Sequence, residues 1–131
     1  MKLSVDTNVL VRSVVRDDAR QARAAEKALT EAALIAVSLP CLCEFVWVLR
    51  KVYRFADAEI AAAIRALAAA EKVAMNRSAV EAGLALLEAG GDFADAIIAH
   101  EGQWLGAEVF VSFDQQAVSL LNRQGQAARL P

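Results

Sequence analysis

Short apolar runs alternate with amphipathic segments along the chain. Lys2–Val5 is a short β-like run, and Leu34–Leu39 is rich in apolar and β-branched residues. Glu108–Ser112 is the last clear core strand, Lys72–Met75 a brief strand candidate and Ala127–Leu130 an edge strand. Strands that alternate with helices favour a central parallel β-sheet flanked by helices on both faces, so we predict an α/β fold.

Helical periodicity fills the segments between these runs. Thr7 or Asn8 is expected to cap the first helix, Ser78 to cap the fifth, and Pro40 fits the first turn of the third. The predicted helices cover Val9–Arg16, Asp17–Ala33, Pro40–Tyr53, Asp57–Ala70, the segment from Ser78 to the Gly90-Gly91 pair, Asp92–Trp104 and Gln115–Asn122.

The size and composition suit one globular domain over residues 1–131. Hydrophobic residues make up 57% of the chain and charged residues 23%, which is apolar for a soluble domain. Two interpretations stay open. Some apolar surface contacts another chain, or alanine-rich helices alone raise the figure.

The net charge, the cysteines and the N-terminal residues each exclude some classes of protein. A net charge of −2 is not typical of general DNA-binding proteins, so a nucleic-acid substrate would require local basic patches or bound cations. Cys41 and Cys43 lack the second pair that a zinc knuckle needs, and we expect them to be reduced core residues. Asp6 interrupts the first apolar stretch, so we expect no secretion signal and a cytoplasmic protein.

Four acidic residues follow or precede the predicted strands in a regular way. Asp6 comes directly after the first strand and Asp114 just after the last core strand. Glu44 lies early in the helix after the second strand, and Asp95 lies in the first turn of the helix before the last core strand. Because parallel sheets bind ligands at the carboxyl ends of their strands, we expect these four carboxylates at one rim.

Four clustered carboxylates repel one another unless a cation lies between them. Oxygen ligands without histidine or cysteine favour Mg²⁺ or Mn²⁺ over zinc. Such ions assist phosphodiester hydrolysis, because they acidify water and offset phosphate charge.

Each carboxylate also has a structural alternative. Asp6 would cap the helix after it, Asp114 would begin the last helix, and Asp95 would join a capping arrangement with Asp92. Glu44 would be an exposed residue favoured by the helix N-terminus. Against this, apolar neighbours surround Glu44, and a buried carboxylate is costly unless it is paired or binds a cation.

The acidic motifs resemble those of VapC-type toxins, which are PIN-domain ribonucleases. Met1–Leu10 resembles the opening of these proteins, Cys43–Leu49 their second acidic motif, Asp92–Ala99 the third and Ser112–Asp114 the fourth. The order and spacing fit across nearly the whole chain. The resemblance implies a PIN fold, Mg²⁺-dependent RNA cleavage with Mn²⁺ as a possible substitute, a homodimer, and neutralisation by a cognate VapB-type antitoxin.

The resemblance also implies roles for individual residues. Asp6 and Asp95 match the direct metal ligands, and Glu44 and Asp114 complete the catalytic pocket directly or through water.

Other polar residues have open assignments. Asn8 and Ser112 would orient the carboxylates, or cap a helix and end a strand. His100 has no acid or nucleophile at helical spacing, and we expect a structural role. Two basic series would bind RNA phosphates or form solvated helix faces: Arg12, Arg16, Arg20, Arg23 and Lys27, and then Arg50, Lys51 and Arg54.

Other functions fit the motifs less well. A haloacid-dehalogenase-type phosphatase needs a second acid two residues after Asp6, where this chain has Asn8. A PIN-like nuclease without an antitoxin remains an alternative. A non-catalytic PIN-like module would have lost one or more of the four acids.

Overall fold

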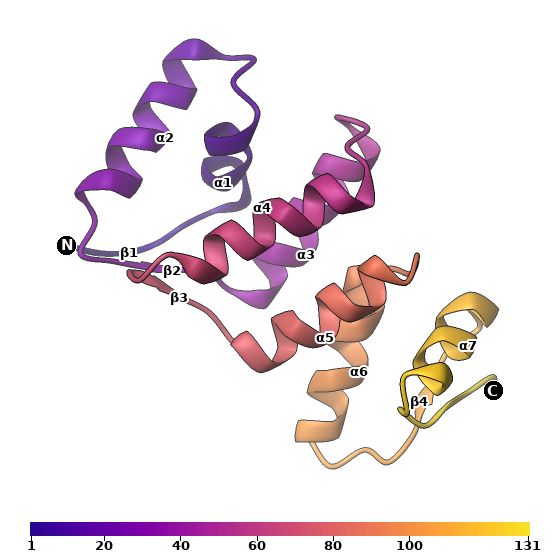
Figure 1. Ribbon diagram of the computed structural model, residues 1–131. Helices are drawn as coiled ribbons and strands as arrows, with labels where there is room; N and C mark the ends of the chain where they lie inside the picture. Colours follow the sequence, from indigo (N-terminus) through magenta and orange to yellow (C-terminus); the bar gives the residue numbers. More distant parts are fainter. The chain divides into compact units, whose positions relative to one another are not determined.

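The computed structural model describes residues 1–131 and divides them into two compact units (Figure 1). Unit 1 is Met1–Asn76 and unit 2 is Arg77–Pro131. Each unit is an α/β arrangement with parallel strands.

Unit 1 contains a three-stranded parallel sheet in the order β1-β2-β3. Lys2 pairs with Leu34, and Ile35 pairs with Val73. Its elements are β1 (Lys2–Ser4), α1 (Thr7–Val14), α2 (Ala19–Glu31), β2 (Leu34–Ala36), α3 (Leu39–Lys51), α4 (Asp57–Ala69) and β3 (Val73–Ala74).

Side-chain caps define where the helices of unit 1 begin. The carboxylate of Asp18 accepts a hydrogen bond from the Gln21 amide, and the Ser38 hydroxyl accepts one from the Cys41 amide. These bonds satisfy amide groups that lack a partner in the first turn. The buried side of α3 includes Leu42, Phe45 and Leu49, all without exposed surface, so this face fixes the orientation of the helix.

Unit 2 contains three helices, of which the first two pack against each other, and a two-stranded parallel sheet. The Cβ that an alanine would place at Gly83 lies 2.4 Å from a ring carbon of the fully buried Phe93. Only glycine therefore permits this close approach of α5 and α6. The elements are α5 (Arg77–Glu88), α6 (Phe93–Trp104), β4 (Phe110–Val111), α7 (Gln115–Arg123) and β5 (Ala128–Arg129).

The structure confirms the predicted α/β class with parallel strands and corrects several details. The strands form separate three-stranded and two-stranded sheets. Asp6 caps α1 in place of Thr7 or Asn8, and α5 begins at Arg77, so Ser78 is not its cap. β2 is shorter than predicted, because the chain leaves the strand before Ser38 caps α3. No helix combines the length and apolar character needed to cross a bilayer.

Candidate functional site

Asp6 lies just after β1 and serves as the N-cap of α1. Its Oδ1 atom accepts a hydrogen bond of 2.8 Å from the Thr7 amide. The residue is exposed. The expected structural alternative is therefore real, yet the cap uses only one carboxylate oxygen and leaves Oδ2 for another ligand.

Glu44 is exposed on α3, as the structural alternative predicts, so burial of its carboxylate gives no argument for a bound cation. The apolar neighbours Phe45 and Val46 are buried, while Glu44 lies on the opposite side of the helix. The helical period explains this outcome, because adjacent residues differ in direction by about 100°.

Cys41 shows that the two acids of unit 1 lie near the same side chain. Burial raises the pKa of the Cys41 thiol, and a hydrogen bond with the Thr7 side chain opposes this change. The negative charges of Asp6 and Glu44 raise the same pKa further. Cys41 and Cys43 are both free thiols, as expected, although Cys43 is only partly buried.

Asp95 is half-buried in the first turn of α6. Burial raises the pKa of its carboxyl, and the negative charges of Asp92 and then Asp114 raise it further. Asp92 is the N-cap of α6 and accepts a 3.0 Å hydrogen bond from the Ala94 amide. The Asp95 carboxylate is therefore not the helix cap.

Asp114 follows β4 and caps α7. Its Oδ1 atom accepts a 3.0 Å hydrogen bond from the Ala117 amide. The Asp114 amide donates to the Ser112 hydroxyl at 3.0 Å, so Ser112 orients the turn that carries this carboxylate. As in Asp6, the cap engages a single carboxylate oxygen.

The structure thus brings the candidate acids together in pairs. Asp6 and Glu44 lie near Cys41 in unit 1, and Asp95 and Asp114 interact in unit 2. No cluster of three or more histidine, cysteine, aspartate or glutamate side chains able to hold a metal occurs. The donors nevertheless fit Mg²⁺ or Mn²⁺, because they are carboxylate oxygens and a cation would offset the repulsion that acts on Asp95.

Several basic residues are engaged within the chain. Ion pairs join Arg12 to Asp17, Arg16 to Glu26 at 3.2 Å, and Arg50 to Asp57 at 2.8 Å. Internal pairing reduces the positive charge that these arginines offer to RNA. The three paired arginines are therefore weaker phosphate sites than their sequence spacing indicates.

The contacts of His100 were not predicted from the sequence. Its Nε2 atom accepts a hydrogen bond from the Trp104 indole and lies 3.1 Å from the Ser78 hydroxyl. An indole N–H only donates, so Nε2 is the acceptor of this hydrogen bond. The spacing of four residues between His100 and Trp104 was a visible signal, whereas Ser78 comes from another helix.

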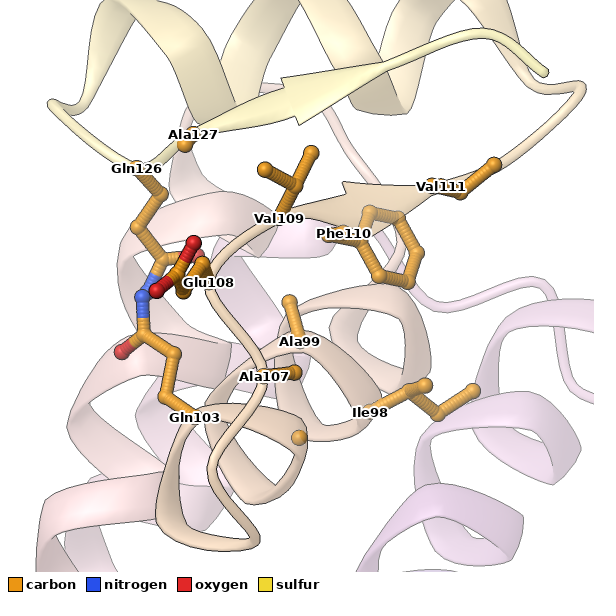
Figure 2. Close-up of a pocket in the computed structure, with 11 residues that line it drawn as sticks. Ile98, Ala99, Gln103, Ala107, Glu108, Val109, Phe110, Val111, Gln126 and Ala127 are labelled. Atoms are coloured by element: carbon orange, nitrogen blue, oxygen red, sulfur yellow. The ribbon is translucent and has the colours of Figure 1, made fainter.

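The pocket in Figure 2 is separate from the candidate acids of unit 2. It has a volume of about 210 Å³, and its lining includes Ile98, Phe110 and Val111 on one side. Glu108 is the only carboxylate in its lining, and the Gln126 Oε1 atom is buried without a hydrogen-bond partner. This cavity lacks the acid pair that phosphodiester chemistry requires.

Comparison with known protein families identifies the class. The PIN domain family matches residues 3–120, which include all four candidate acids and most of both units. The chain therefore belongs to the PIN domain family. PIN domains are typically metal-dependent nucleases, so membership indicates a nuclease. No curated protein showed significant similarity to the chain.

Proposed function

We propose that the chain is a metal-dependent endoribonuclease in which Asp6, Glu44, Asp95 and Asp114 act as one site. The observation that carries this proposal is a single PIN family match that includes these residues. The acid pair in each unit supports it. Under this proposal, residues 1–131 function as one domain.

Each of the four acidic residues would have its own role in the site. Asp6 and Asp95 would bind Mg²⁺ or Mn²⁺ directly, with Glu44 and Asp114 completing the pocket. Bound cations would supply charge compensation for the phosphodiester and acidify water for in-line attack. The caps at Asp6 and Asp114 hold these carboxylates in place, which limits the reorganisation needed on binding.

Metal-dependent cleavage of RNA tests this function. We expect the purified chain to cut internally within an end-labelled RNA when Mg²⁺ or Mn²⁺ is present, and to stop when EDTA is added. Gel analysis of the fragments measures this, and hydrolysis of a small phosphate monoester in parallel tests the phosphatase alternative. Undiminished RNA cleavage in excess chelator would contradict the metal mechanism.

We further propose that the chain is the toxin of a VapBC-type pair and forms a homodimer. The order of the four motifs supports the toxin assignment. Exposed apolar side chains such as Trp104 and Leu105, which are 76% and 89% exposed, are compatible with partner proteins.

Co-expression tests the antitoxin. Expression of the chain alone is expected to slow growth, and co-expression with the product of the adjacent gene is expected to restore it. A positively charged antitoxin segment would bind the carboxylates, so the purified complex should cut RNA poorly. A neighbouring product that neither binds the chain nor lowers its nuclease rate would remove the toxin assignment and leave the nuclease proposal intact.

A further inference from the structure

An exposed aromatic ring accompanies one candidate carboxylate in each unit. In unit 1, Trp47 follows Glu44 by three residues on α3, and in unit 2, Phe113 directly precedes Asp114. Trp47 is 58% exposed and Phe113 is 86% exposed. Aromatic side chains dominate cores and interfaces, so exposed rings beside candidate catalytic acids point to a ligand that covers them.

Trp47 lies between two opposite charges on the exposed face of α3. Glu44, Trp47 and Lys51 are spaced three and four residues apart, which places them on one side of the helix. All three are exposed. Arg50 pairs with Asp57, whereas Lys51 forms no ion pair. The face therefore presents a carboxylate, a ring and an uncompensated positive charge.

Phe113 is held outward by the turn that carries Asp114. The Asp114 amide donates to the Ser112 hydroxyl, and the Asp114 carboxylate accepts from the Ala117 amide. Both bonds constrain the backbone next to Phe113. The exposure of this ring thus belongs to a defined turn between β4 and α7.

We propose that Trp47 and Phe113 each stack on an unpaired base of bound RNA and that Lys51 contacts the RNA backbone. This inference rests on the proposed ribonuclease function. Every base has a flat face, so stacking selects unpaired nucleotides with little regard to sequence. Loss of one stacked ring weakens binding by about 5- to 150-fold.

The charges beside Trp47 favour RNA over a second copy of the chain. Lysine and glutamate are depleted in the cores of protein–protein interfaces, although tryptophan is enriched there. Trp47 has Glu44 on one side and Lys51 on the other. A nucleic-acid strand supplies both a ring for stacking and a phosphate for the lysine.

Steady-state cleavage of a short single-stranded RNA by the full chain tests the inference. Trp47→Ala and Phe113→Ala are each expected to raise KM about tenfold with little change in kcat, because stacking acts on binding. Trp47→Phe and Phe113→Tyr are expected to restore most of the affinity. Trp104→Ala is the matched control, since Trp104 is exposed but lies at the far end of α6 from Asp95.

The outcomes separate stacking from nuclease function. Normal KM values in both alanine variants would overturn the stacking role while cleavage by the wild type still supports the nuclease. If the wild type cuts no RNA, the nuclease proposal fails, and fluorescence polarisation of the same labelled RNA then decides: equal Kd values for wild type and variants overturn stacking. If light scattering gives a lower molecular mass for Trp47→Ala than for the wild type, Trp47 is a contact between subunits. That result would overturn its proposed stacking on RNA.

Discussion

Asp95→Asn is expected to lower the rate of RNA cleavage by more than about 100-fold. Residues that only orient a metal ligand already contribute about 10- to 100-fold, and Asp95 is proposed to bind the metal directly. Asparagine keeps the shape but removes the negative charge. A time course with labelled RNA at saturating Mg²⁺ measures the rate, and circular dichroism shows whether the fold is retained.

Asp92→Ala provides the control from the same helix. Asp92 caps α6 through the Ala94 amide, so its loss should cost about 1 kcal/mol of stability and leave cleavage largely intact. A wild-type rate in Asp95→Asn together with an inactive Asp92→Ala would reverse the two assignments.

The caps at Asp6 and Asp114 allow charge and structure to be separated. Asparagine caps helices about as well as aspartate, so Asp6→Asn and Asp114→Asn should melt near the wild-type temperature. Both variants are nevertheless expected to lose RNA cleavage activity, as Asp95→Asn does. If these variants instead remained active, capping would be the whole role of these residues.

Phe93→Ala is expected to lower the free energy of unfolding by about 3–5 kcal/mol, the usual range for removing a buried phenyl ring. Phe93 is fully buried and begins α6, the helix that also carries Asp95. Typical domains are stable by only about 5–15 kcal/mol, so this loss is severe. Urea unfolding followed by circular dichroism measures it through the transition midpoint.

Phe113→Ala makes the same chemical change at an exposed position. With Phe113 86% exposed, the expected change in unfolding free energy is within about 0.5 kcal/mol. Similar losses in the two variants would contradict the assignment of Phe93 to the core. The comparison of the two variants also tests whether Phe113→Ala is stable enough for the stacking experiment.

Local patterns predicted the elements well, because strand and helix periods are properties of neighbouring residues. The start of α6 after Asp92 and the place of Pro40 in α3 followed from capping and proline rules alone. The start of α5 was misplaced, since the Ser78 hydroxyl contacts His100 on α6 and sequence spacing does not reveal contacts between helices.

The candidate acids were found from sequence, but their surroundings were not. The exposure of Glu44 depends on which face of α3 packs inward, and the partners of Arg12 and Arg50 lie in other segments. Only the structure shows that Asp95 is partly buried beside the charges of Asp92 and Asp114. Packing between different elements and the geometry of the loops between them decide these features.

The double use of Asp6 and Asp114 affects how this chain can diverge. Each residue stabilises a helix whether or not RNA is cut. A descendant that abandons catalysis still needs a side-chain acceptor at these positions, and asparagine or serine supplies one at little cost in stability. Glu44 and Asp95 provide no such cap, so relaxed selection is expected to let them drift first. Catalytically inactive relatives should therefore keep polar residues at positions 6 and 114 after the other two acids have been replaced.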